Sequence, residues 1–432
     1  MKPVPLPATD DRRFAWLLLA LFWATLAFAL LPDGLDWARD TALQNAQQGS
    51  FVRRMQWMPP FLLSALIIWL RRGVALQVAR QIDPWLALFL GWAILSLAWS
   101  DYPAATVRKL VLLVGTVLIA LAFQVASWRP ERLRRHSRAC ISALVLASIA
   151  AVFLMPDIAR VAGYDNAWTG IARSKNHLGM AAGLMMVLWM HGLAIGEVRA
   201  LPALAWTAIA ALTLIMARNA TALLCVLAVL PPLWLFFRPI VSLRRVALSG
   251  VLALAAIAVS LSFVILVGHG IPTWGELVSP VATAVGRDVT FTGRLEIWRL
   301  VYAEVVQHPW LGTGFQAFWL GAGGPAPWVT QNLYGGLWQA HNGYLDVANE
   351  LGIPGLLITL GFCVNTVRRG LLLVPRWRAE ATWLIAFMVF LAITNIAEST
   401  LFRPIHFLFL LSIHASLALA RLRAVEPSEQ AR

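Results

Sequence analysis

Long apolar segments recur along the whole chain, and they constrain its fold more than any other feature of the sequence. A helix needs about 20 mostly apolar residues to cross a bilayer. Candidate spans lie at residues 14–31, 57–70, 84–99, 107–126, 139–155, 177–196, 201–217, 220–237, 246–268, 344–364, 382–396 and 404–420. Only 13% of the residues are charged, whereas a soluble domain of this length would have roughly 25%. The sequence therefore predicts an all-α polytopic integral membrane protein with about twelve transmembrane helices.

The spans predict one membrane domain over residues 1–432, with no separate soluble domain. Residues 14–268 hold the first nine predicted helices, and residues 269–340 form one large hydrophilic loop that carries short helices. Residues 341–432 hold the last three helices and a tail. The first span is too long, and too poor in small residues at its end, for a cleaved signal peptide. It is therefore interpreted as a membrane helix.

The distribution of basic residues predicts the orientation of these helices. With the N-terminus inside, 22 of the 35 Lys and Arg residues and 8 of the 21 acidic residues lie in cytoplasmic segments. All of the net charge of +14 then lies on the inner face, as the positive-inside rule requires. Both termini are predicted to be cytoplasmic and the large loop to be periplasmic. Nucleic-acid binding would need a basic patch with aromatic residues on one soluble face, and the sequence shows no such patch.

The segment from residue 290 to residue 355 has an unusual composition for a loop beside a bilayer. Among many glycines and prolines it concentrates Arg294, Trp298, Arg299, His308, His341 and Asn342. Such residues suggest a site that holds an anionic, lipid-borne substrate and performs proton chemistry on it. The sequence after Thr292 predicts an N-capped amphipathic helix that ends before Pro309. Arg294 lies in its first turn, where anions bind well, and this favours a phosphate-facing role.

Basic residues also recur near the predicted outer ends of the helices, where the positive-inside rule disfavours them. The set comprises Arg108, Lys109, Arg173, Lys175, Arg218, Arg294, Arg299 and Arg403. Any single one is more simply explained by a side chain that extends into the headgroup region. The set as a whole is better explained by a diphosphate, because guanidinium groups bind phosphate oxygens bidentately and stay charged.

Several short segments carry a resemblance to a known family. They are WSDYPAATVRK (99–109), ARSKNHLG (172–179), TGRLEIW (292–298), HPWLGTGF (308–315) and HNGYLDVANELGIPG (341–355), with NIAEST (395–400) as a fainter addition. In this order, and on one side of the membrane, they resemble the O-antigen ligase/polymerase superfamily of bacterial membrane glycosyltransferases, particularly its exopolysaccharide-polymerase branch.

The resemblance implies a GT-C-like fold in the bacterial inner membrane. It implies transfer of a glycan from undecaprenyl diphosphate, at the periplasmic face, to a hydroxyl of a glycan or lipid A core acceptor. Inversion at the anomeric carbon is implied, with no metal and no cofactor. The family's functional positions are the arginine of TGR and the histidine of HN, here Arg294 and His341. The basic residues before KN correspond to Arg173 and Lys175.

The chemistry of such a transfer sets two tasks, namely charge stabilisation on the diphosphate and deprotonation of the acceptor hydroxyl. Metal-dependent enzymes use a divalent ion held by paired carboxylates, but the outer acidic residues show no Asp-x-Asp pair. Arginines are therefore predicted to replace the ion. An ordinary imidazole titrates at about pH 6.5, so His341 is predicted to be the base. The alternative for His341 is a helix-capping or interfacial role. Asn342 is expected to orient the sugar or the ring, and Glu350 and Glu398 are reserve candidates for the base.

A polytopic secondary transporter or flippase, acting on a glycolipid or a small solute, is the alternative function. Transporters typically have inverted repeats and acidic residues in the middle of spans. The sequence shows no internal repeat and no Asp, Glu or Lys deep within a predicted span. Within the enzyme class, ligation to a lipid A core and polymerisation of repeat units differ only in the acceptor, and the sequence does not decide between them.

Overall fold

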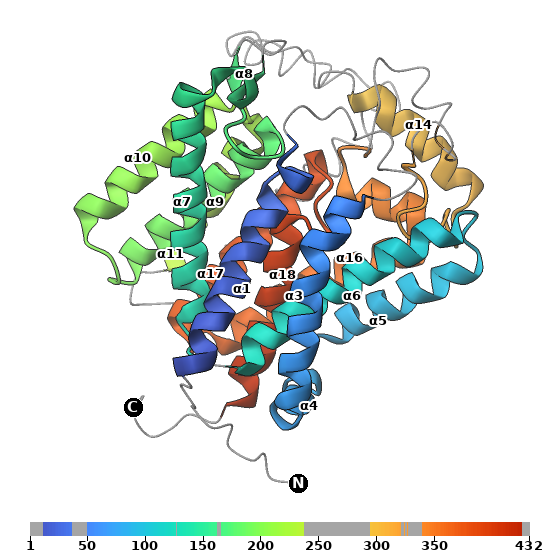
Figure 1. Ribbon diagram of the computed structural model, residues 1–432, viewed down its shortest axis with the longest axis horizontal. Coiled ribbons are helices and arrows are strands. Elements are labelled where there is room, and N and C mark those ends of the chain that lie inside the picture. The colour runs from blue at the N-terminus through green and yellow to red at the C-terminus, as the bar shows by residue number, and fades with distance from the viewer. Residues whose placement is uncertain are drawn as a thin grey trace.

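The computed structural model describes residues 12–36, 50–126, 128–161, 166–236, 294–320, 324, 326 and 339–425. The helices are α1 (Arg12–Leu30), α3 (Phe51–Leu70), α4 (Arg72–Ala79), α5 (Pro84–Leu95), α6 (Pro103–Ala126), α7 (Arg132–Leu154), α8 (Pro156–Ala159), α9 (Lys175–Ala194), α10 (Ala200–Met216), α11 (Ala220–Phe236), α14 (Arg294–Gln307), α16 (Gly343–Leu373), α17 (Arg378–Ala397) and α18 (Phe407–Ala424). Two 3-10 turns, η1 (Asp33–Leu35) and η2 (Ser96–Ala98), and two short strands, β1 (Arg160–Val161) and β2 (Ala167–Trp168), complete the described elements. The part of the chain that the structure describes is thus mostly helical, as predicted (Figure 1).

The predicted spans agree with the helices wherever the structure describes them. The span at 246–268 lies outside the described residues, and each of the others coincides with a helix. By length and apolar composition, six described helices can cross a membrane, namely α6, α7, α9, α16, α17 and α18. The pair α3 and α4, bent by 98°, gives up to seven. These features support a polytopic membrane protein, while the number of about twelve helices and the periplasmic position of the loop stay predictions.

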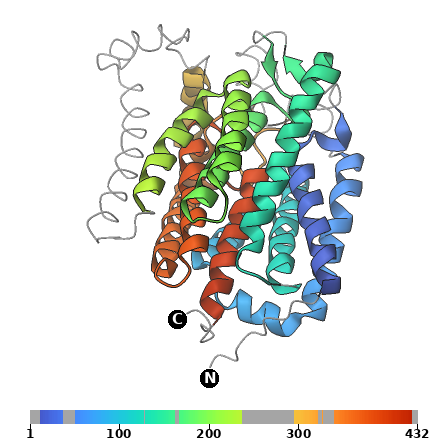
Figure 2. The same ribbon diagram turned by 90° about the vertical axis from the view of Figure 1, so that its left-hand side faces the viewer.

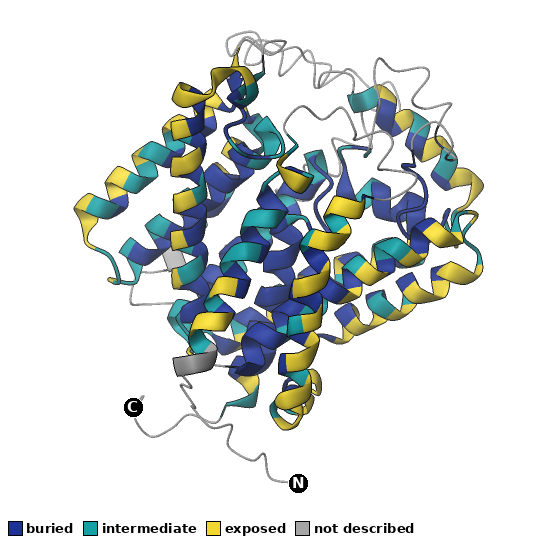
Figure 3. Ribbon diagram, in the orientation of Figure 1, coloured by how far each residue is buried: buried dark blue, intermediate teal, exposed yellow. Residues whose placement is uncertain are grey.

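Helix α18 forms the centre of the bundle. It contacts α6, α16, α17, α1 and α4, and 89% of the residues in this apolar helix are buried. A helix that is apolar on every side is stable only when other helices surround it. The exposed positions gather instead on the outer helices such as α3, α5 and α10, whose apolar side chains suit contact with lipid (Figure 3).

The bundle has two distinct ends. Helix α14 lies at one end, together with the end of α1 and the start of α3 (Figures 1 and 2). Helix α4 lies at the other, where α1 begins and α18 ends (Figures 1 and 2). We refer to them as the α14 end and the α4 end.

Helix α16 is broken near its start, although the sequence predicts an uninterrupted span there. Gly352 adopts φ 69° and ψ −176°, and Pro354 follows inside the helix. A proline lacks the amide hydrogen that would continue the ladder, so carbonyl groups before it lose their helical partners. The carbonyl of Leu351 instead accepts from Trp92 Nε1 at 3.0 Å. The break therefore separates a short first segment, residues 343–351, from the rest of α16.

Candidate functional site

The sequence segments that carry the family resemblance interlock at the α14 end. The loop after α14 runs along the first segment of α16, where the amide of Thr313 donates to the carbonyl of Asn349 at 3.0 Å. The amide of Gly314 donates to the carbonyl of Glu350 at 2.9 Å. Gly352 lies against the backbone of Trp310, and its positive φ and this close approach both require glycine. The HPWLGTGF and GIPG segments therefore form one packed unit.

Asn395 shapes the turn that follows α17. Its Oδ1 accepts from the amides of Thr400 and Leu401 at 3.0 and 2.9 Å, and its Nδ2 donates to Thr400 Oγ1 at 2.8 Å. A Cβ added at Gly343 would collide with Asn395 Oδ1. This explains why the HNG and NIAEST segments belong together, and it fixes the position of Glu398 within the turn.

Glu398 is the hub of the site. Its Oε1 accepts from Arg294 Nη2 at 2.8 Å and from Asn176 Nδ2 at 2.7 Å, while its Oε2 lies 3.3 Å from His341 Nδ1. Arg294 also donates from Nη1 to the carbonyl of Ala397 at 2.5 Å. The structure thus brings together Arg294 and His341, the two residues predicted to be catalytic, on the two oxygens of one carboxylate. The side chain of Glu398 is 4% exposed, whereas that of His341 is 26% exposed.

The backbone on either side of His341 is firmly anchored. The carbonyl of Ala340 accepts from Trp298 Nε1 of α14 at 2.9 Å, and its amide donates to Asp346 Oδ1 at 3.1 Å. His341 itself adopts φ 53°, a left-handed conformation that is uncommon for a residue with a Cβ. Such a conformation persists only where surrounding contacts hold it, and it is often found at functional sites.

Asn342 has a positioning role in the structure. It is the N-cap of α16, and its Oδ1 accepts from the amides of Tyr344 and Leu345, each at 3.1 Å. This cap satisfies donors that the first helical turn leaves unpaired. The capping function considered for His341 is therefore performed by its neighbour.

Arg403 and two acidic residues of α16 form a second charged group behind the first. Arg403 Nη1 lies 2.8 Å from Glu350 Oε1, and Nη2 lies 2.8 Å from Asp346 Oδ2. Burial alone would lower the pKa of Arg403, but the two carboxylates raise it above its ordinary value. Although the sequence has no Asp-x-Asp pair at this end, the helix brings two of its acidic residues together. Asp346 and Glu350 lie one helical turn apart and share Arg403 as their cation.

Arg173 lies in a third group, with Asp33 and Arg53. Its Nη2 is 2.8 Å from Asp33 Oδ1, and Arg53 Nε donates to Asp33 Oδ2 at 3.0 Å. Burial raises the pKa of Asp33, but the two guanidinium groups outweigh it and hold that pKa below the ordinary 3.8. Lys109 is within electrostatic range of Asp33, Arg53 and Arg403, so the second and third groups are neighbours.

The other predicted diphosphate ligands have less defined positions. Arg299 is on the exposed side of α14, and Arg218 is exposed in the turn between α10 and α11, with φ 50°. Arg108 near the start of α6, and Lys175, the first residue of α9, are partly exposed. No contact that the structure shows for these four joins them to Glu398 within the described part of the chain, and their role stays a prediction.

Sequence reasoning missed Asp33, Arg53, Asn176 and Asp346. Asn176 and Asp346 lie inside the family segments ARSKNHLG and HNGYLDVANELGIPG, so a signal existed for them. Asp33 and Arg53 lie outside every such segment.

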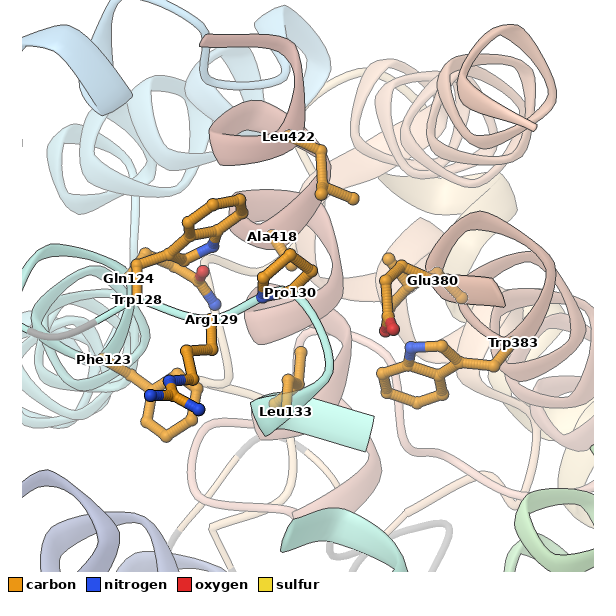
Figure 4. Close-up of a pocket in the computed structure, with 11 residues that line it drawn as sticks. Phe123, Gln124, Trp128, Arg129, Pro130, Leu133, Glu380, Trp383, Ala418 and Leu422 are labelled. Atoms are coloured by element: carbon orange, nitrogen blue, oxygen red, sulfur yellow. The ribbon is translucent and has the colours of Figure 1, made fainter. Parts of the chain in front are cut away.

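The small cavity drawn in Figure 4 is separate from this site. It is lined by residues that include Gln124, Trp128, Glu380 and Trp383. Glu380 lies near the start of α17, whereas Glu398 follows its end, so the cavity belongs to the α4 end. Among the residues that the structure describes, no group of three or more His, Cys, Asp or Glu side chains is arranged to hold a metal ion.

Comparison with known proteins supports the resemblance of the sequence. Residues 203–360 match the model of the O-antigen ligase family. This range contains Arg294 and His341, but not Arg173, Glu398 or Arg403. The exopolysaccharide production protein ExoQ of Rhizobium meliloti (strain 1021) is 26% identical over 290 residues, which cover 63% of this chain and 62% of that protein, slightly less than two thirds of its length. Both comparisons support the resemblance of this chain to the O-antigen ligase/polymerase superfamily.

Proposed function

We propose that the protein transfers a glycan from undecaprenyl diphosphate to a sugar hydroxyl, with inversion and without a metal ion, in exopolysaccharide polymerisation or O-antigen ligation or polymerisation. The observation that carries this proposal is the contact of Arg294 and His341 with one buried carboxylate, Glu398. A candidate base and a candidate phosphate ligand thereby lie side by side and are partly exposed. The similarity to an exopolysaccharide production protein favours a polysaccharide product.

His341 is proposed to take the proton of the acceptor hydroxyl at Nε2. A carboxylate can only accept a hydrogen bond, so the contact with Glu398 requires the proton of the neutral ring on Nδ1. Gln339, whose side-chain amide lies 3.2 Å from the same nitrogen, must then present its oxygen, which corresponds to a flip of the amide. Nε2 is left with a free lone pair, and Glu398 stabilises the imidazolium that forms when it accepts the proton.

Arg294 is proposed to stabilise the negative charge that develops on the diphosphate as the glycosidic bond breaks. Its guanidinium is fixed by Glu398 and by the carbonyl of Ala397, so little reorganisation is needed during the reaction. Arg294 is the first residue of α14, where the helix dipole also favours an anion. Arg173 and Lys175 occupy the corresponding place at the start of α9, and are proposed to bind the same diphosphate.

The site is proposed to face the periplasm from the inner membrane, with both termini in the cytoplasm. The distribution of basic residues supports this orientation. In the structure, α1 begins and α18 ends at the α4 end, opposite the site (Figure 1). Reporter fusions that located residues 269–340 in the cytoplasm would contradict both the orientation and the mechanism.

The experiment that tests the function uses the purified full chain and an undecaprenyl-diphosphate-linked glycan. His341→Ala is expected to lower turnover by about 10²–10⁴, the usual cost of losing a general base. Binding of the donor should be nearly intact, because the arginines hold the diphosphate. His308→Ala, in an exposed histidine after α14, is the matched control and should retain activity. More than roughly a tenth of wild-type turnover in His341→Ala would remove His341 from this role.

A further inference from the structure

Asp33 is shared by two arginines from different parts of the chain. Arg53 donates hydrogen bonds to Asp33 Oδ2 from Nε, at 3.0 Å, and from Nη2. Arg173 donates from Nη2 to Asp33 Oδ1 at 2.8 Å. One negative charge therefore meets two positive charges, and Lys109 lies within electrostatic range of the same carboxylate. In the part of the chain that the structure describes, two guanidinium groups share this one carboxylate, so the described group carries an excess of positive charge.

Two helix starts converge on this group and add to its attraction for anions. Arg53 lies in the first turn of α3, where its own amide donates to the N-cap Ser50. Arg173 directly precedes Ser174, the N-cap of α9. Cations are disfavoured at helix starts and anions are favoured there, because the helix dipole is positive at that end. The placement of both arginines is understandable if a further anion binds between them.

The group is held in place and is still accessible. The amide of Arg173 donates to the carbonyl of Leu30 at 2.9 Å, which attaches the segment before α9 to the end of α1. The side chains of Arg173, Arg53 and Asp33 are 32%, 21% and 17% exposed. Arg173 Nε is buried and donates to no acceptor in the part of the chain that the structure describes. The geometry thus includes at least one strong donor that is not used.

We propose that Arg53 and Arg173 form an anion subsite for a phosphate group of the lipid-diphosphate donor, and that Asp33 is a resident carboxylate which this phosphate displaces. The inference rests on the proposed function and extends it to Arg53 and Asp33. A phosphate group offers more acceptor oxygens and more charge than a carboxylate, and it can use the fork of each guanidinium. Asp33 keeps the two arginines apart and oriented while the site is empty.

Binding of undecaprenyl diphosphate to the full chain, in nanodiscs of phosphatidylcholine, tests the subsite without any need for turnover. Arg53→Ala should bind this lipid about tenfold more weakly, the loss expected for a charge-assisted contact. Arg54→Ala is the matched control, because Arg54 is the next residue of α3 and is exposed. It should bind nearly as tightly as the wild type.

Asp33→Asn gives the sharper test, because it predicts a gain. Removal of the competing carboxylate should strengthen binding by about fivefold, the factor that one partly exposed ion pair contributes. If Asp33 only held the arginines in position, the same substitution would weaken binding, and the proposal would be overturned. Equal affinity of Arg53→Ala and Arg54→Ala would overturn it as well. That comparison remains decisive if Asp33→Asn does not fold.

Two further binding measurements identify the source of the phosphate and separate this inference from the proposed function. Nanodiscs that contain phosphatidylglycerol should compete weakly. If they abolish the difference between Arg53→Ala and Arg54→Ala, the subsite binds bilayer phospholipid and the donor assignment is wrong. If the wild-type protein binds no undecaprenyl diphosphate, the proposed function fails. If the wild type binds it and Arg53→Ala binds it equally well, only the subsite fails.

Discussion

Arginine–carboxylate contacts occur at both ends of the bundle, but they differ in accessibility and in the elements they join. At the α4 end, Arg134 of α7 binds Glu380 of α17 at 2.7 Å and also Glu197 after α9. Its side chain is 4% exposed. At the α14 end, the shared partner Glu398 is equally buried, but Arg294 and His341 reach the surface. The same kind of contact thus joins buried helices at one end and holds partly exposed side chains at the other.

From this difference we expect the buried contacts to serve stability and the partly exposed groups to serve the proposed chemistry. A buried ion pair gives little net stability, because desolvation of both charges offsets their attraction. Removing one partner is nevertheless costly, because the other is left buried and unpaired. Arg294 is partly exposed, so water can take its place beside Glu398, and Glu398 keeps the hydrogen bond that Asn176 donates. Arg134 and Arg294 should therefore respond to alanine substitution in opposite ways.

The largest effect is expected for stability, at Arg134 and at Arg403. The side chain of Arg403, at the α14 end, is 16% exposed, but its loss would leave two buried carboxylates, Asp346 and Glu350, without this cation, as the loss of Arg134 would leave Glu197 and Glu380. Arg134→Ala and Arg403→Ala should each lower stability by about 3–5 kcal/mol. The expected result is a loss of the monodisperse peak when solubilised protein is heated before size-exclusion chromatography. Wild-type thermal stability of Arg403→Ala would return Arg403 to the set of accessible phosphate ligands.

The next effect is expected for activity alone, at Arg294. Arg294→Ala should reduce glycan transfer by about 10²–10³, the usual cost of one preorganised donor to developing charge. Its thermal stability should stay close to that of the wild type. Lysine should rescue poorly, because it lacks the planar fork of the guanidinium. Arg72→Ala, at an exposed arginine that begins α4 at the opposite end of the bundle, is the control. Unfolding of Arg294→Ala would show that Arg294 is a structural residue like Arg134, and the contrast between the two ends would then be lost.

A smaller loss of activity is expected at Glu398, which acts through its neighbours. Glu398→Gln keeps the size of the side chain but removes the charge that pairs with Arg294 and orients His341. We expect turnover to fall by about 10–10², as for residues that orient a reactive group. Donor affinity should change little. Glu398→Asp should recover part of the loss, which a packing defect alone would not predict. A loss in donor affinity without a loss in turnover would contradict this positioning role.

The sequence predicted the helices well because each apolar run carries its own signal, independent of the rest of the chain. It also singled out Arg294 and His341, which the structure places on one carboxylate, because both lie in segments with a family pattern. The partners of these residues were harder to predict. Asn176 and Glu398 are 222 positions apart, and His341 and Glu398 are 57 apart. Only the packing of α9, α16 and α17 brings them together, and no local pattern encodes that arrangement.

The break in α16 shows a second limit of the sequence. The GIPG segment contains the glycine and proline that end regular helix, so a break is understandable afterwards. Hydropathy alone treats residues 344–364 as one span, because the apolar residues continue across the break. The hydrogen bonds that stabilise it come from Thr313 and Gly314 in the loop after α14 and from Trp92 in α5. The site thus depends on a helix irregularity that tertiary contacts stabilise.

The smallest effect is expected from removal of divalent metal ions. Metal-dependent transferases hold their ion between paired carboxylates. At the α14 end, two carboxylates that lie close together, those of Asp346 and Glu350, already bind Arg403. Glu398 is likewise occupied by Arg294 and Asn176. Glycan transfer in excess EDTA should therefore equal transfer without it. Complete loss with EDTA that Mg²⁺ or Mn²⁺ restores would show that a carboxylate of this end exchanges its arginine for a metal ion, and the α14 end would then be a metal site instead of an arginine site.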